Sequence, residues 1–271
     1  MIRSILVALT VLGLLTPAPA GAVEEVPPNN FVTRCKFTHR APDDPIAHPG
    51  MPGMSHDHTF VGNPSTNAFS TVESLRAATT TCHRLGDTAA YWMPTLFVAG
   101  TAVMPNLSTI YYRRRTVAPV SAFPPGFKLI AGDAHATGPQ SLKVTNWNCG
   151  PKAKATIPRS STVPTCPNTR RKRLQLHVTF PDCWDGVNLD SADHKSHMAY
   201  SAGGECPDGY PVALPEITMN YAYPTLGGPS TSLASGGQLT AHADFFNAWD
   251  EAELQALIDR CLNIPVMCGR D

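Results

Sequence analysis

The sequence predicts a mainly β (α+β) fold: a β-sandwich-like core with long loops, few helices and disulfide staples. Three observations favour it. Short segments rich in β-branched and aromatic residues alternate with turn residues along the chain. The 26 prolines indicate short strands and many loops. The eight cysteines form an even set.

Five segments have the composition of strands. The clearest lies within 173–180, where apolar and polar residues alternate strictly, so that His177 is expected to face away from the core. Its core-facing residues would be Leu174, Leu176, Val178 and Phe180. The other expected strands are 91–98, 108–112, 128–131 and 212–223.

Two helices are expected beside these strands. One covers 72–78. The other begins after Asp250, which stands at the N-cap position with Glu251 and Glu253 in the first turn, beside the positive end of the helix dipole. Its buried face would consist of Leu254, Leu257, Ile258 and Cys261.

The first 22 residues have the layout of a secretory signal peptide. Arg3 precedes an apolar run over 5–15, and small residues allow cleavage after Ala20 or Ala22. An eleven-residue helix would span about 16 Å, too short for a hydrocarbon core of about 30 Å. We therefore expect a signal peptide (1–22), a flexible leader (23–30) and a single domain (31–271), without a transmembrane segment.

Export makes the cysteines disulfide candidates. Eight cysteines allow 105 pairings. Sequence proximity favours three of them, and the remaining two cysteines would then pair. The expected bridges are Cys35–Cys82, Cys149–Cys166, Cys183–Cys206 and Cys261–Cys268.

The charge balance argues against a nucleic-acid or anionic-membrane partner. The chain has 21 basic and 21 acidic residues, and charged residues make up only 15 % of it. We expect a secreted monomer of about 250 residues, long enough to bury a sizeable core.

Histidines and aspartates gather in three loop-like segments. His56 and His58, at i and i+2, would project to the same side of an extended segment. His242 and Asp244 repeat this spacing, and the third segment, 193–197, ends at His197. Such groups beside aromatic residues are typical of a sugar-binding cleft or a metal site. The alternative is that these side chains only satisfy backbone groups, as Asp43 and Asp44 would in a turn.

Several stretches also match one known pattern: 33–35, 44–46, 48–50, 55–58, 60–63, 91–96, 123–127, 180–186, 196–200 and 242–245. On these stretches the chain resembles DUF1996, a domain of unknown function in secreted fungal and bacterial proteins, over nearly all of the expected mature chain. Some relatives carry carbohydrate-binding modules, so the resemblance implies an encounter with polysaccharide or cell wall. Ala248 departs from the glycine that family members often have there, which concerns local packing only.

Three functions follow as hypotheses. The first is an enzyme that acts on extracellular polysaccharide or cell-wall glycan, a hydrolase or lyase, with histidine and aspartate as acid and base. The second is a zinc- or copper-binding protein. The third is a non-catalytic glycan-binding module. The candidate catalytic residues are His56, His58, His197, His242, Asp185 and Asp244; the candidate sugar-stacking residues are Trp92, Trp184, Trp249 and Tyr91; the alternative metal ligands are His56, His58, His242 and Asp244.

Overall fold

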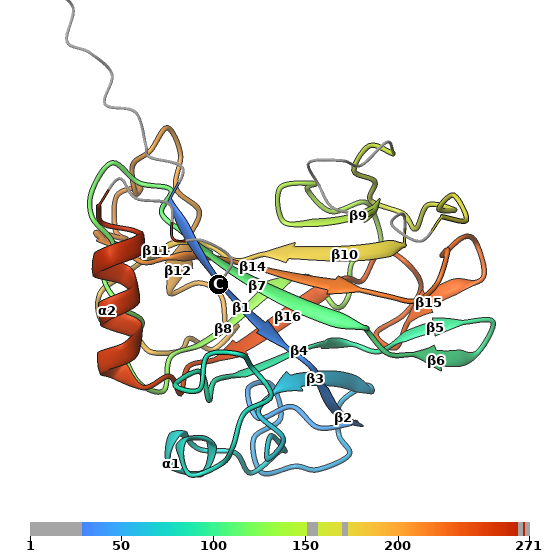
Figure 1. Cartoon of the computed structure of the whole chain (residues 1–271), viewed down its shortest axis with the longest axis horizontal. Coiled ribbons are helices and arrows are strands. Elements are labelled where there is room, and N and C mark those ends of the chain that lie inside the picture. Colours follow the sequence, from blue (N-terminus) through green and yellow to red (C-terminus); the bar gives the residue numbers. More distant parts are fainter. Residues whose placement is uncertain (1–28, 151–156, 170–172, 265–267, 269–271) are drawn as a thin grey trace, which may run out of the picture.

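Two five-stranded antiparallel sheets form the body of the molecule (Figure 1). The structure is a computed structural model that describes residues 29–150, 157–169, 173–264 and 268. The expected signal peptide therefore lies outside the described residues. The first sheet has the order β1 (Asn30–Cys35), β7 (Leu107–Arg113), β14 (Glu216–Ala222), β10 (Leu174–Thr179), β9 (Thr145–Cys149). The second has the order β2 (Phe37–Ala41), β3 (His58–Gly62), β4 (Ala90–Pro94), β16 (His242–Phe246), β8 (Lys128–Gly132).

Smaller elements complete the fold. Helix α1 (Val72–Arg76) lies near β2 and β3, and helix α2 (Glu251–Cys261) covers one end of the sandwich (Figure 1). Two three-stranded sheets flank the body. They have the orders β12 (Met198–Ala199), β11 (Cys183–Trp184), β13 (Val212–Ala213) and β15 (Thr231–Leu233), β5 (Leu96–Val98), β6 (Thr101–Val103).

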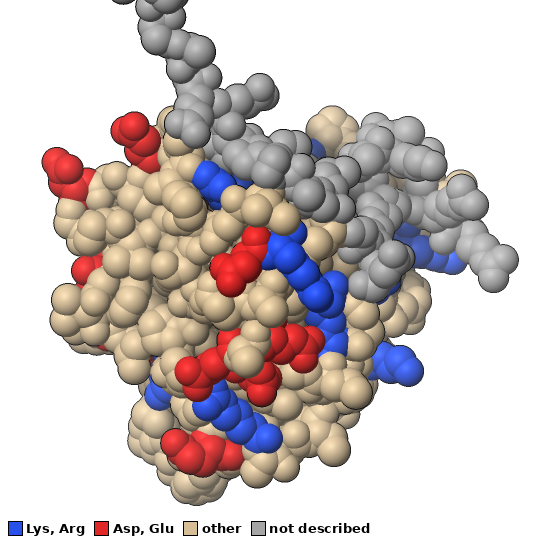
Figure 2. All heavy atoms as spheres, turned by 60° about the vertical axis from the view of Figure 1, so that its left-hand side comes forward, with Lys and Arg blue, Asp and Glu red and all other residues tan. Residues whose placement is uncertain are grey.

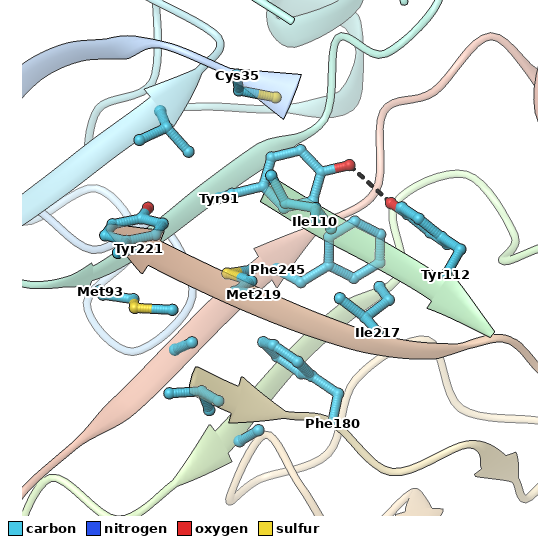
Figure 3. Packing of buried hydrophobic residues seen from close by; sticks show 14 of the residues in the cluster. Cys35, Tyr91, Met93, Ile110, Tyr112, Phe180, Ile217, Met219, Tyr221 and Phe245 are labelled. Atoms are coloured by element: carbon cyan, nitrogen blue, oxygen red, sulfur yellow. Dashed lines mark hydrogen bonds between the residues drawn. The ribbon is translucent and has the colours of Figure 1, made fainter. Parts of the chain in front are cut away.

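The facing sides of the two large sheets share one buried core. Figure 3 shows Phe245 and Tyr91 from the second sheet pointing toward Ile217 and Tyr112 of the first. The Tyr91 and Tyr112 hydroxyl groups are 2.6 Å apart, and the indole of Trp249 donates to both oxygens, at 3.1 and 3.0 Å. The core thus contains a satisfied polar bridge between the sheets.

The sandwich class and most expected elements are confirmed. Strand 91–98 is interrupted at Thr95, and 212–223 divides into β13 and β14. Helix α2 begins after Asp250, whose side chain accepts the Glu253 N–H at 2.9 Å. The four residues of its expected apolar face are all buried. All four expected disulfides are also present: Cys35–Cys82, Cys149–Cys166, Cys183–Cys206 and Cys261–Cys268.

His177 faces away from the main core, as expected, yet it is only 7 % exposed, since Gln175 and His177 on the outer face of β10 are buried as well. Of the expected leader, the structure describes only Asn29 and Asn30: β1 starts at Asn30, and the Asn29 amide donates to the carbonyl of Leu262 at 3.2 Å.

Acidic and basic side chains lie beside each other on the face that Figure 2 shows, with no broad patch of one sign. Among the described residues, no helix is long and apolar enough to cross a membrane. Four disulfides fit a protein of an oxidising compartment outside the cytoplasm.

Candidate metal centre

Neighbouring strands of the second sheet bring distant histidines together. His58, the first residue of β3, pairs with Pro94 of β4, and on the other side of β4 Asp244 pairs with Trp92. Two residues earlier in β16, the same antiparallel register places His242 beside Pro94. Residues at one level of a sheet share a face, so the imidazoles of His58 and His242 point the same way, with ring centroids 5.8 Å apart.

His56 reaches the same place from the loop before β3. Its ring centroid is 4.3 Å from that of His58 and 4.9 Å from that of His242. The intervening Asp57 forms an ion pair with Arg40 at 2.8 Å instead. The expected projection of His56 and His58 to one side is therefore what the structure has.

The three imidazoles point nitrogen atoms at one another. One nitrogen from each of His56, His58 and His242 lies within 4.8 Å of the other two. The Nε2 atoms of His56 and His242 are 3.1 Å apart. Nε2 of His58 is buried and has no hydrogen-bond partner among the described residues.

Backbone carbonyls fix the orientation of two of the rings. Nδ1 of His58 donates to the carbonyl of Asp43 at 3.0 Å, and Nδ1 of His242 donates to that of Thr240 at 2.9 Å. Because a carbonyl only accepts, Nδ1 carries the proton and Nε2 keeps its lone pair in each neutral ring. Metal-ligating histidines are held in the same manner.

Burial also favours the neutral form of all three rings. Loss of hydration lowers the pKa of His56 to about 4 and that of His242 to about 3, and it lowers the pKa of His58 well below its usual value. At neutral pH the cluster therefore consists of uncharged imidazoles.

Two carboxylates border the imidazoles. Asp44 and Asp244 form a second group with His58, again with ligand atoms within 4.8 Å of one another. Both oxygens of Asp244 are buried and have no hydrogen-bond partner in the part of the chain that the structure describes, and Oδ2 is 4.0 Å from Nε2 of His242. Burial raises the pKa of both carboxyl groups, and the charge of Asp44 raises that of Asp244 further.

The cluster opens onto a cleft of about 390 Å³. His56, His242, Asp44 and Asp244 line this cleft, and the sequence reasoning missed several other lining residues. Asp44 was expected to cap a turn. It does so, because Oδ1 accepts the N–H groups of Ile46 and Ala47, but it also borders the histidines. The other ionisable lining residues that were not among the predicted site residues are His48, Asp133, His135, Asp193 and Lys195.

A glycine allows β8 to approach β16 at this point. Gly132 lies directly opposite His242 and has a φ of +84°. A Cβ there would lie 2.4 Å from the carbonyl oxygen of Ala241 and 2.8 Å from Cα of His242. Only glycine therefore leaves the His242 backbone where it is.

Two candidate catalytic residues lie apart from the cluster. His197 has both ring nitrogens engaged, by the hydroxyl of Ser191 at 2.8 Å and the carbonyl of Lys128 at 2.9 Å. Asp185 accepts the N–H groups of Val187 and Asn188 and so shapes a turn. Neither residue lines the cleft.

The candidate stacking residues do not line the cleft either. Trp92, Trp249 and Tyr91 have no exposed surface, which leaves no ring face for a sugar. Trp184 is partly exposed, but its indole packs edge-on against Phe127. These four residues support the fold around the site.

A third group of possible ligands, Cys35, Cys82 and Asp87, offers no thiolate because the two cysteines are bonded to each other.

The described residues define a disulfide-bonded β-sandwich with one histidine-lined, carboxylate-flanked cleft. The chain belongs to the DUF1996 family, described as a domain of unknown function, whose model matches residues 44–249. This range contains all five residues of the histidine and aspartate groups. No curated protein and no solved structure matches the chain.

Proposed function

We propose that His56, His58 and His242 bind one transition-metal ion, zinc or copper, and that the protein acts on extracellular polysaccharide by metal-assisted chemistry. The observation that supports the ion most directly is the convergence of three imidazole nitrogens from two strands and a loop. Neutral imidazole nitrogens are among the ligands that these metals prefer.

The spacing suits a metal. Two nitrogens bound tetrahedrally to zinc at about 2.0–2.1 Å lie about 3.3–3.4 Å apart. The 3.1 Å between the Nε2 atoms of His56 and His242 is close to that value. Three protein ligands with one side open to solvent are typical of catalytic zinc sites, whereas structural sites are closed by four.

The aspartates support a reaction rather than storage of the ion. Oδ2 of Asp244 lies 4.0 Å from Nε2 of His242, and we assign Asp244 a role next to the ion and not on it. When bound, the metal supplies Lewis acidity that activates water. Asp244, with Asp44 beside it, would accept the proton that this water loses.

Two other functions compete with this one. In a metal-free enzyme the same histidines and aspartates would act as general acid and base. A non-catalytic glycan-binding module would hold its polymer without changing it. Metal content distinguishes the metal-free enzyme from our proposal. The release of new chain ends from polysaccharide distinguishes the non-catalytic binding module from it.

The direct test is elemental analysis of the purified mature protein and its variants. We expect close to one equivalent of zinc or copper in the wild type, and less than a tenth of that in His56→Ala and His242→Ala. His197→Ala is the matched control, since it removes a buried histidine outside the cluster and should keep the metal. Wild-type protein that binds no metal after incubation with zinc or copper would refute the proposal.

A further inference from the structure

A methionine lines the cleft together with the proposed metal ligands. Met54 belongs to the lining, as His56 does. It stands two residues before His56 and four before His58, and in an extended segment these three side chains lie on one side. Asp57, between the two histidines, instead forms an ion pair with Arg40 at 2.8 Å. The row of candidate ligands therefore continues into the loop before β3, and its next member is a thioether.

Hydrogen bonds fix the backbone on both sides of Met54. The N–H of Gly53 donates to Oδ1 of Asp43 at 3.0 Å. The N–H of Ser55 donates to the carbonyl of Pro42 at 3.1 Å. The turn thus holds Met54 at the cleft through the backbone of its two neighbours, and the methionine side chain is not needed to keep it there.

The sulfur of Met54 is accessible for binding. The side chain is 62 % exposed, and in the described part of the chain it belongs to neither buried hydrophobic cluster. A methionine side chain has three rotatable bonds, so its sulfur can turn toward an ion held by the residue two positions further on. A thioether also has no proton to lose before it coordinates a metal.

The charges of the cleft favour a cation but do not select the metal. Among the described lining residues four aspartates stand against one lysine: Asp44, Asp133, Asp193 and Asp244 against Lys195. An acidic lining of this kind attracts zinc and copper ions alike. The choice between the two metals must therefore come from the type of the ligand atoms.

The ligand atoms favour copper. Zinc sites in proteins use thiolate, imidazole and carboxylate ligands, whereas soft thioethers select cuprous copper. Divalent copper is also bound more tightly than divalent zinc by a given set of nitrogen ligands. Three imidazoles with a thioether beside them therefore fit copper in both oxidation states, since the nitrogens suit either state and the sulfur suits the cuprous one.

We propose that the metal of this centre is copper and that the thioether of Met54 is a ligand of its cuprous form. This assignment rests on the proposed function for the three imidazole ligands, and it adds the identity of the metal and a fourth ligand. In the cupric form the sulfur is at most a weak and distant ligand, as axial methionines are in other copper sites, and the open position remains for water.

Competition titrations of the purified mature protein test this, with bicinchoninate as the competitor for cuprous copper under anaerobic, reducing conditions and with a metal-binding dye for zinc and cupric copper. Met54→Leu removes the sulfur and nearly conserves the side-chain volume. It should weaken cuprous binding ten-fold or more and leave zinc and cupric binding within about three-fold. Because only the cuprous affinity changes, a ten-fold loss corresponds to a reduction potential lower by about 59 mV, which voltammetry measures independently.

Met51→Leu is the matched control. Met51 is 45 % exposed in the same turn but is not among the described residues that line the cleft, so its replacement should change none of these affinities. X-ray absorption of the cuprous protein should show one sulfur neighbour of copper in the wild type and in Met51→Leu, and none in Met54→Leu.

The outcomes separate this assignment from the metal centre itself. Equal cuprous affinity in wild type and Met54→Leu, with metal content that still depends on His242, would refute the role of Met54 alone. An equal loss of zinc and cuprous binding in Met54→Leu would also refute it, since a soft ligand should act on cuprous copper only. A wild type that binds neither metal would refute the imidazole centre and the thioether ligand together.

Discussion

Chelation should lower the thermal stability of the protein by an amount that follows from linkage. A ligand that binds only the folded state stabilises it by about 2.7 kcal/mol when its free concentration is 100 times its dissociation constant. For a domain of roughly 150–250 residues, each kcal/mol raises the melting temperature by about 2–4 °C. We therefore expect zinc or copper, at 100 times the measured dissociation constant, to raise the melting temperature by roughly 5–11 °C over the chelated protein.

Calorimetric melting of matched variants decides where this stabilisation arises. His242→Ala should lose the metal-dependent rise in melting temperature. It removes one of two proposed ligand nitrogens, Nε2 of His56 and Nε2 of His242, which lie 3.1 Å apart. His197→Ala should melt at a lower temperature than the wild type but keep the full rise, since both of its nitrogens serve the fold. A metal-dependent rise of equal size in wild type and His242→Ala would refute the assignment.

Three further predictions concern the surrounding structure. Burial raises the pKa of Asp87 to about 7, above its unfolded value of about 3.9. The free energy of unfolding of the wild type should therefore fall by up to about 4 kcal/mol as the pH rises from 4 to 7. Denaturant unfolding across this range should show a smaller dependence of the unfolding free energy on pH for Asp87→Asn. Gly132→Ala should weaken metal binding ten-fold or more in a titration with a competing chelator, since its Cβ would displace His242, and unchanged affinity would contradict this. Leu257→Ala, in the buried face of α2, should cost about 2–5 kcal/mol by denaturant unfolding, whereas Leu85→Ala, at an 80 % exposed position, should cost less than about 0.5 kcal/mol.

Local sequence signals predicted the fold class and many elements, because those signals act over a few residues. Asp250 with Glu253 and the apolar spacing of α2 specify that helix almost alone. Strands β3 and β16 were missed because they are buried on both faces and contain His58, His242 and Asp244, so neither alternates apolar with polar residues.

The candidate site was predictable in part. The i, i+2 spacing placed His56 beside His58, but their meeting with His242 depends on the sheet register, since His56 and His242 are 186 positions apart in the sequence. Asp44 looked like a turn residue because it is one. The error on Trp92 and Trp249 has a general cause: large aromatic side chains contribute so much to a core that their presence near polar motifs does not indicate exposure.

X-ray absorption spectroscopy of the metal-loaded protein tests the central claim most directly. We predict a first shell of nitrogen and oxygen at about 2.0–2.1 Å with the outer-shell scattering of three imidazoles, and the same spectrum in His197→Ala. A first shell without imidazole scattering would contradict the assignment of His56, His58 and His242 as the metal ligands.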